Sequence, residues 1–207
     1  MRKPYTLVEI LVAVSIIGIL TATGLGITSY VRNKVAETQT KTTIKLIEMA
    51  FQKYNDKTGS YPVTEDKNGS DLTPFLAIEI PKDWTVNDLK WITAFNDVTL
   101  PQSTSTNPTA SGLKIRGIRL EETNGSANHR KYYFLDGWGR KLICLNPGIF
   151  NSSTSYDLIS FGGDKLAGDG STKKGISDCA TEKQDKFKEQ TFYPDEIGDD
   201  ITNFTRN

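Results

Sequence analysis

Glu9 is the first residue with chemical consequences, because it is the one charged side chain in an otherwise apolar stretch. Leu7 to Ile27 is a run of 21 residues with a single charge. At a rise of ~1.5 Å per residue this stretch can cross a ~30 Å hydrocarbon core, so it is predicted to be a membrane segment or a signal peptide. A carboxylate in such a helix costs ~2.5–3.5 kcal/mol at mid-bilayer, so Glu9 is expected to have a cationic partner.

Two ordinary interpretations of this segment leave Glu9 unexplained. A secretory signal would use Arg2 and Lys3 as its basic region and Leu7 to Leu20 as its apolar region, with cleavage near Thr21-Ala22-Thr23. The acid interrupts that apolar run, however, and the sequence beyond the supposed cut continues a helical pattern. A plain transmembrane anchor also gives the acid no partner.

A third interpretation supplies the partner. Residues Tyr5-Thr6-Leu7-Val8-Glu9-Ile10-Leu11 resemble the N-methylation motif of type IV pilins and of the pseudopilins of type II secretion, and Gly18 falls where these families usually have glycine. The resemblance implies that a leader is cut between Pro4 and Tyr5, that Tyr5 becomes the N-methylated first residue, and that Glu9 pairs with the amine of a neighbouring subunit. Such mutual neutralisation offsets the cost of burying either charge. Pro4 departs from the motif, because these families usually have glycine before the cut.

The helical pattern continues beyond the apolar segment. Ile44, Ile47, Phe51 and Tyr54 recur at spacings of three and four, which predicts one apolar stripe on an amphipathic helix. The stretch Thr58-Gly59-Ser60-Tyr61-Pro62 is a stop signal. We therefore expect one helix from about Thr6 to Lys57, roughly 75–80 Å long, whose last third packs on a globular domain.

The rest of the chain predicts short strands separated by turns. Leu72–Ile78 and Val86–Phe95 are expected to be short helices, and Gln102–Ser111 a loop rich in Ser, Thr, Asn and Pro. The β-rich runs are Leu113 to Leu120, Lys131 to Leu135, Lys141 to Asn146 and Tyr156 to Phe161. The predicted fold class is α+β: a long N-terminal helix, with a membrane half and an amphipathic half, packed on a small antiparallel β-sheet with a C-terminal loop.

This prediction divides the chain into consecutive regions. They are a leader peptide (1–4), a transmembrane and polymerisation helix (5–30), the amphipathic helix end (31–62), a variable region of helices, strands and loops (63–112), the antiparallel sheet (113–161) and the C-terminal loop (162–207). Asp136-Gly137-Trp138-Gly139-Arg140 resembles the Asp-Pro-Trp-Gly turn of major pseudopilins, with Gly137 in place of proline. We expect Trp138 to be a packing residue.

The C-terminal region resembles the calcium loop of major pseudopilins. Ser160 to Asp164 and Gly198 to Phe204 are similar to the two ends of that loop. The resemblance implies that Ca²⁺ is held by the side chains of Asp164, Asp199 and Asp200 and by the backbone carbonyls of Phe161 and Leu166. Such oxygen donors are what Ca²⁺ takes. The alternative is an acidic, solvated loop, and the inserted residues from Ala167 to Ile197 offer Asp169 and Asp195 as substitute ligands.

The remaining reactive side chains do not form an enzyme motif. Cys144 and Cys179 are expected to form a disulfide if this part of the chain lies outside the cytoplasm, and two cysteines do not make a metal site. The lone histidine, His129, lies in a polar turn with no nucleophile, phosphate loop or Cys-x-x-Cys motif beside it. We therefore expect no enzymatic activity.

These features predict a structural subunit. The formal net charge is zero, so no nucleic-acid partner is predicted. The resemblance implies a homopolymeric pseudopilus for type II-type secretion, with minor pseudopilins, a prepilin peptidase and an inner-membrane assembly platform as partners. It also implies a single-pass anchor in the inner membrane, with the soluble domain outside the cytoplasm. The alternatives are a surface type IV pilin for adhesion, motility or DNA uptake, and a membrane-anchored binding protein that does not polymerise.

Overall fold

The fold consists of one long helix and a set of short antiparallel strands. The computed structural model describes residues 5–62, 75–81, 91–101, 112–124, 129–146, 148, 154–163, 166–167, 174–175 and 201–203. Its helices are α1 (Leu7–Thr58) and the 3-10 helix η2 (Ile92–Ala94). Its strands are β1 (Ala77–Pro81), β2 (Val98–Thr99), β3 (Lys114–Ile115), β4 (Arg119–Asn124), β5 (His129–Leu135), β6 (Ile143–Leu145), β7 (Asp157–Ser160), β8 (Leu166–Ala167), β9 (Lys174–Gly175) and β10 (Ile201–Thr202).

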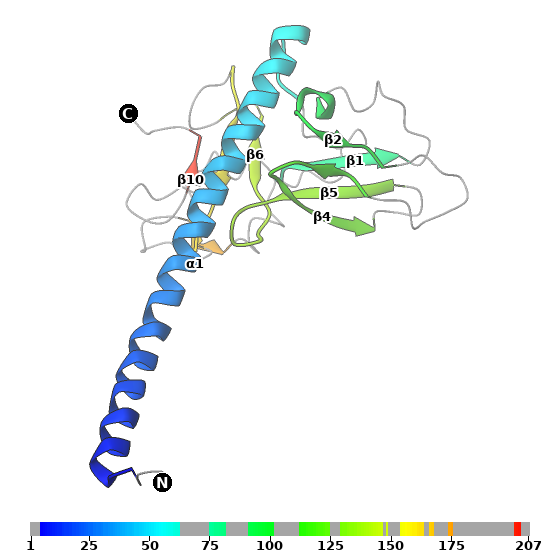
Figure 1. Ribbon diagram of the computed structural model, residues 1–207. Helices are drawn as coiled ribbons and strands as arrows, with labels where there is room; N and C mark the ends of the chain where they lie inside the picture. Colours follow the sequence, from blue (N-terminus) through cyan, green and yellow to red (C-terminus); the bar gives the residue numbers. More distant parts are fainter. Residues whose placement is uncertain are drawn as a thin grey trace.

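Helix α1 begins and ends where its sequence chemistry requires. Thr6 is its N-cap, and Gly59 ends it in the left-handed conformation at φ 76°, which glycine adopts without steric cost. The Gly59 amide donates to the carbonyl of Asn55 at 2.7 Å. The predicted helix is therefore confirmed to within one residue at each end. Figure 1 shows its N-terminal half projecting away from the strands.

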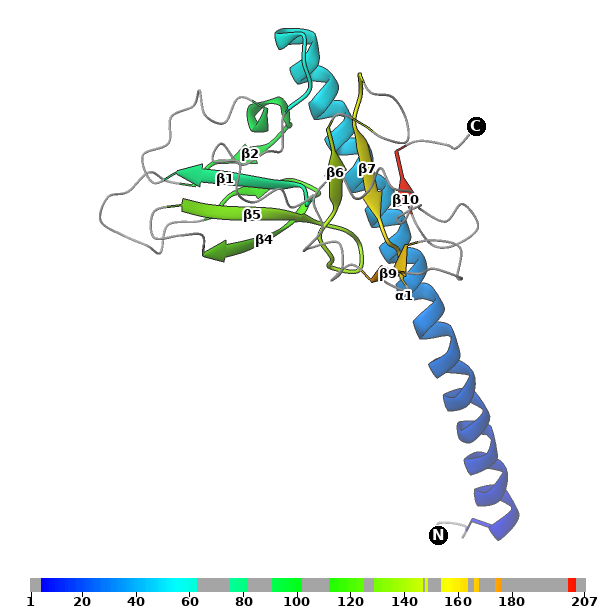
Figure 2. The ribbon, with the colours of Figure 1, turned by 180° about the vertical axis from the view of Figure 1, so that it is seen from behind.

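The strands form more than the single sheet that the sequence predicts. Within the described residues, one sheet has the order β1-β5-β4 and a second has the order β10-β7-β6, while β2-β3 and β8-β9 are two-stranded pairs. The chain passes from the first sheet to the second through the turn between β5 and β6 (Figure 1). Seen from behind, β6, β7 and β10 lie along the helix, and the sheet of β1, β5 and β4 extends to one side (Figure 2).

The predicted β-rich runs are confirmed, and one predicted helix is wrong. Strands β3 to β7 fall within or next to those four runs. The described part of Leu72–Ile78 is extended instead of helical, because Phe75 bridges Ile143 and β1 pairs with β5. In Val86–Phe95 the 3-10 helix Ile92–Ala94 is the described helical part.

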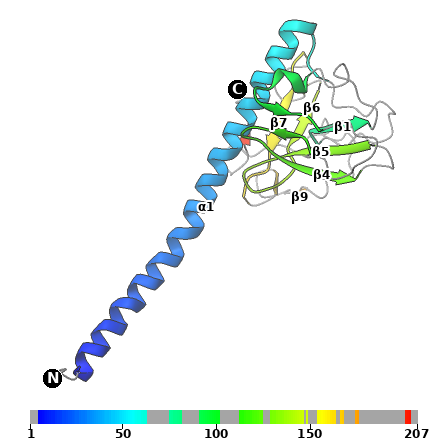
Figure 3. The same cartoon turned by 45° about the vertical axis from the view of Figure 1, so that its right-hand side comes forward.

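The core joins the second half of α1 to strands from both three-stranded sheets. Ile47 and Phe51 of the helix are completely buried, as are Phe134 and Leu158 of the strands. The Phe51 ring meets the rings of Trp91 and Tyr156 edge-on, at centroid distances of 5.5 Å and 4.8 Å. Burial of each large side chain contributes roughly 1.5–3 kcal/mol. The mixed α+β class is confirmed, and the strands lie beside the C-terminal half of α1 (Figure 3), which supplies Ile44, Ile47, Ala50 and Phe51 to the core.

Candidate functional site: the N-terminal helix and its attachment

The first turn of α1 is closed by three reciprocal hydrogen bonds between Thr6 and Glu9. The Glu9 amide donates to Thr6 Oγ1 at 3.3 Å. In return, Glu9 Oε2 accepts from the Thr6 amide at 2.8 Å and from the Thr6 hydroxyl at 2.9 Å. This capping box satisfies amides that an α-helix otherwise leaves without partners at its start. The carboxylate of Glu9, which the sequence analysis predicts to pair with a neighbouring subunit, therefore caps the start of the helix within its own chain.

The second carboxylate oxygen of Glu9 is available for another contact. Both bonds to Thr6 use Oε2, and Oε1 has no partner among the described residues. Tyr5, the residue just before the N-cap, is 82% exposed. A cation from another chain can thus approach Oε1 without breaking the capping box. Pro4 lies outside the described residues, so the predicted cut between Pro4 and Tyr5 stays a prediction.

The first part of α1 exposes large apolar side chains on every side of the helix. They are Leu7, Val8, Ile10, Leu11, Val12, Val14, Ile16, Ile17, Ile19 and Leu20, each between 49% and 79% exposed. A helix that is apolar all round is stable when something else covers it. Among the described residues, no helix is long and apolar enough to span a membrane.

The covered part of α1 begins at Ala36, where a tight turn after β5 docks on it. The Gly137 amide donates to Thr40 Oγ1 at 2.8 Å. A Cβ added at Gly137 would lie 1.8 Å from the carbonyl oxygen of Ala36, so only glycine fits this approach. Trp138 packs against the core and its Nε1 donates to Asn33 Oδ1 at 3.4 Å. The structure thus gives Trp138 the packing position that the sequence predicts.

Asp136 holds this turn together from inside the protein. It is 1% exposed, and its Oδ1 accepts from the amides of Trp138 at 2.9 Å and Arg140 at 2.8 Å. Its Oδ2 accepts from the hydroxyl of Ser160 at 2.8 Å. Because Ser160 ends β7, one buried carboxylate connects the turn after β5 with the second sheet. Buried charges persist when they are hydrogen-bonded in this way.

Arg140 extends the same connection into the start of the C-terminal region. Its guanidinium donates to the carbonyl of Gly162 and, at 2.9 Å, to the carbonyl of Gly163. These carbonyls directly precede Asp164, the first predicted calcium ligand, in the sequence. A fixed positive charge therefore stands at the start of the predicted calcium loop.

The predicted calcium ligands fall partly within the described residues. Phe161 is 2% exposed directly after β7, and Leu166 opens β8. Asp164, Asp199 and Asp200 lie outside the described residues, and within the described part no three His, Cys, Asp or Glu side chains are grouped so as to hold a metal. Strand β10 pairs with β7 through Ile201 and Ser160. The calcium site therefore stays a prediction.

Cys144 is a free, fully buried cysteine in β6. Burial, with a smaller effect from nearby Asp157, raises the pKa of its thiol above the ordinary value. Cys179 lies outside the described residues, so the Cys144–Cys179 disulfide stays a prediction. The side chain of His129 is likewise not described, although the residue itself begins β5.

The chain was compared with known proteins in three ways. No family model, no curated protein and no solved structure matches it.

Proposed function

We propose that this protein is a pilin-like structural subunit that assembles into a pseudopilus filament for type II-type protein secretion. The observation that carries the proposal is the division of α1 into two parts. Up to Leu20 its large apolar side chains are exposed on all sides, whereas from Ala36 onward one face is fixed to the globular part. Such an exposed helix gains most by burial in lipid before assembly and among other copies of itself afterwards.

Glu9 gives this burial its specificity. The proposed membrane segment rests on the 21 residues from Leu7 to Ile27, which contain one charge. The uncommitted Oε1 of Glu9 would accept from the new amine of Tyr5 in the next subunit, and two opposite charges that meet in an apolar environment lower the cost of placing either there. A subunit in the wrong register would leave both charges unpaired, so the pair would also fix the stagger between helices.

The proposed partners follow from this assembly. Further copies of the chain and minor pseudopilins would share the filament, a prepilin peptidase would remove the leader, and an inner-membrane platform would drive assembly. Before assembly the subunit would span the inner membrane once, with its globular part outside the cytoplasm.

One observation favours a second candidate, a membrane-anchored binding protein that never polymerises. The capping box already gives Glu9 two hydrogen bonds within its own chain. If those bonds were its whole role, Glu9 would need no partner subunit. The leader would then not have to be removed, so a proline at position 4 would be no obstacle.

Substitution of Glu9 separates the two candidates. In cells that contain the assembly system and no other copy of this chain, Glu9→Ala should leave a folded, membrane-inserted subunit that forms few filaments, as counted by electron microscopy of sheared material. Glu37→Gln is the matched control, because it removes another acid of α1 that pairs with Lys34 and Lys41 instead. Normal filaments from Glu9→Ala would contradict the pairing.

We also propose that Ca²⁺ binds the C-terminal loop through Asp164, Asp199, Asp200 and the carbonyls of Phe161 and Leu166. The donors suit a hard cation, and the ion would bring opposite charge to three carboxylates that otherwise repel one another. A free Ca²⁺ concentration of 100 times Kd should stabilise the full chain by ~2.7 kcal/mol and so raise its melting temperature. A chelator should lower the melting temperature again. Asp199→Ala should abolish most of this calcium-dependent difference in melting temperature. If the variant still melts higher with calcium, oxygens other than those of Asp199 hold the ion.

A further inference from the structure

The outer face of α1 carries a stripe of apolar and β-branched side chains in the half of the helix that is attached to the strands. Its residues recur at spacings of three and four, namely Val31, Val35, Thr38, Thr42, Leu46 and Met49. At 3.6 residues per turn the stripe runs on roughly the opposite side of the helix from the core residues Ile47 and Phe51. The outer face of such a helix is ordinarily polar. Here Val31, Val35 and Met49 are 47%, 49% and 51% exposed, so the stripe leaves large apolar side chains open to solvent.

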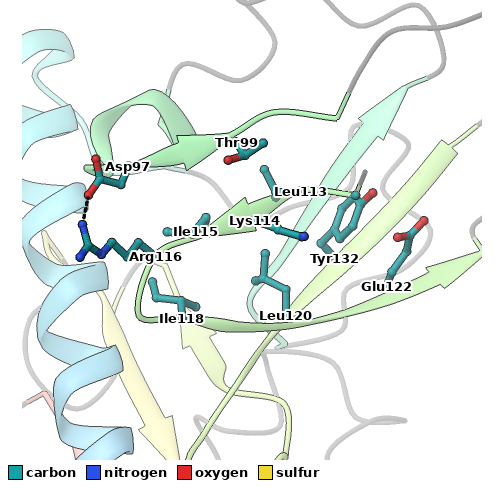
Figure 4. Close-up of a pocket in the computed structure, with 11 residues that line it drawn as sticks. Asp97, Thr99, Leu113, Lys114, Ile115, Arg116, Ile118, Leu120, Glu122 and Tyr132 are labelled. Atoms are coloured by element: carbon teal, nitrogen blue, oxygen red, sulfur yellow. Dashed lines mark hydrogen bonds and ion pairs between the residues drawn. The ribbon is translucent and has the colours of Figure 1, made fainter. Parts of the chain in front are cut away.

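A groove of about 440 Å³ follows the first part of this stripe. It is lined by residues of α1 between Tyr30 and Thr42 and by Gly117, which lies in the turn between β3 and β4. A Cβ added at Gly117 would lie 3.1 Å from Leu46 Cδ1, so the turn closely approaches the helix. Figure 4 shows this turn beside α1, where Arg116 pairs with Asp97 at 3.0 Å. The turn therefore forms a wall where the groove reaches Leu46.

The spacing of the stripe suits a second helix. Side chains three and four residues apart form the ridges and holes into which the side chains of another helix pack. From Val31 to Met49 the stripe is ~27 Å long at 1.5 Å per residue. The short side chains of Thr38 and Thr42 in its middle allow a close approach, because the distance between two packed helices depends on the side chains at the contact. The groove therefore fits an apolar helix of about this length or shorter.

The chain itself contains a helix of this kind. The part of α1 from Leu7 to Leu20 exposes its large apolar side chains on every side and is ~20 Å long. It is shorter than the stripe, so the whole exposed segment can lie along it. Burial of this segment against the stripe removes apolar surface from water on both helices.

The charges beside the groove favour this segment over the second half of another α1. Lys34 lines the groove, and it shares the single acid Glu37 with Lys41, at 2.8 Å and 2.6 Å. These three side chains together carry one net positive charge. The one charge between Leu7 and Leu20 is the acid Glu9, which is complementary to that border. The second half of another α1 would instead bring the same lysines against it.

We propose that the stripe from Val31 to Met49 is the docking surface for the Leu7–Leu20 segment of a second copy of this chain. The inference rests on the proposed filament and deepens it, because it names the surface of the attached half of α1 that receives the exposed half of another subunit. The wall at Gly117 limits how far along the stripe the docked helix can lie.

Photo-crosslinking tests the contact directly. A p-benzoylphenylalanine is introduced in place of Val35, in cells that contain the assembly system and no other copy of this chain. We expect cross-linked dimers in which the probe is attached between residues 7 and 20 of the second copy, as located by mass spectrometry. The matched control is the same probe in place of Lys57, which is exposed in the last turn of α1 about two turns beyond the stripe. It should give at least tenfold less of this product.

A charge placed in the stripe tests the same contact by its effect on assembly. Val35→Asp would bury an unpaired carboxylate under the docked helix, so it should reduce the number of filaments at least tenfold. Val35 is half exposed and lies outside the core, so the variant should melt at the temperature of the wild type. Lys57→Gln makes the same change of charge outside the stripe and should leave the number of filaments unchanged.

The outcomes separate the docking surface from the filament function. Cross-links from Val35 to residues 7–20 without filaments would keep the docking surface and contradict the filament. Filaments whose Val35 probe attaches to lipid or to another part of the chain would overturn the docking surface alone. A filament count for Val35→Asp equal to that of the wild type would do the same. The absence of both filaments and cross-links would overturn both proposals.

Discussion

The carboxylate of Asp136 offers the sharpest test of how the globular part is attached to α1. It is 1% exposed and accepts hydrogen bonds from Trp138, Arg140 and Ser160 at 2.8–2.9 Å. Asp136→Ala leaves these three donors without their acceptor. Hydrogen bonds to a charged group are worth ~1.5–3 kcal/mol each, and removal of the buried charge returns part of its desolvation cost, so we expect a net loss of ~3–4 kcal/mol.

The expected loss corresponds to ~6–15 °C in the melting temperature of a chain of this size. Thermal unfolding of the full chain in detergent, followed by circular dichroism and tryptophan fluorescence, measures it. Asp136→Asn keeps the shape and one acceptor oxygen, so it should cost only ~1 kcal/mol. Asp56→Ala, a change of an exposed acid on α1, is the control and should cost less than ~0.5 kcal/mol. A loss below ~1 kcal/mol for Asp136→Ala would refute the structural role of this carboxylate.

Three further measurements test other contacts of the structure. Gly137→Ala forces a Cβ to 1.8 Å from a helix carbonyl and should destabilise the protein by more than ~3 kcal/mol in denaturant unfolding, whereas Gly139→Ala, at φ 82° with open space, should cost ~1 kcal/mol. Bonds from Lys34 and Lys41 lower the pKa of Glu37 from its ordinary value of 4.5 to about 2. The stabilisation by Glu37 is therefore fully present above pH 4.5 and is lost as the pH falls through 2. Because the ion pairs are exposed, the difference in stability between wild type and Glu37→Gln should stay below ~1 kcal/mol and should vanish only below pH 2. Cys144 should resist alkylation in the native protein. If alkylation in denaturant without reductant labels two thiols, the predicted disulfide between Cys144 and Cys179 is excluded.

The ends of α1 could be predicted because their causes are local. Thr6 followed three residues later by Glu9 is a capping-box pattern, and Gly59 before Pro62 is a stop signal. Strand β1 could also be predicted, because Leu76, Ile78 and Ile80 alternate with other residues at the spacing of a strand. The helix predicted for Leu72–Ile78 does not fit this period of two. Pro81 at the end of β1 is compatible with its position at the edge of the sheet.

The connections across the fold could not be predicted, because they join residues far apart in the sequence. A period of two predicts a strand and not its partner, so nothing in the sequence separated the β1-β5-β4 sheet from the β10-β7-β6 sheet. Thr40 lies four residues before Ile44 on the apolar stripe, which predicts that it faces inward but not that it accepts from the Gly137 amide. The bonds of Arg140 to the carbonyls of Gly162 and Gly163 had no local signal.

The exposed part of α1 and Glu9 are the features that we propose make this chain a filament subunit. This proposal is tested most directly by electron microscopy of sheared cell-surface material from cells with the assembly system, combined with N-terminal sequencing of the subunit. We expect filaments made of this chain, with Tyr5 as an N-methylated first residue. A chain that stays in the membrane fraction, retains Pro4 and forms no filaments would contradict it.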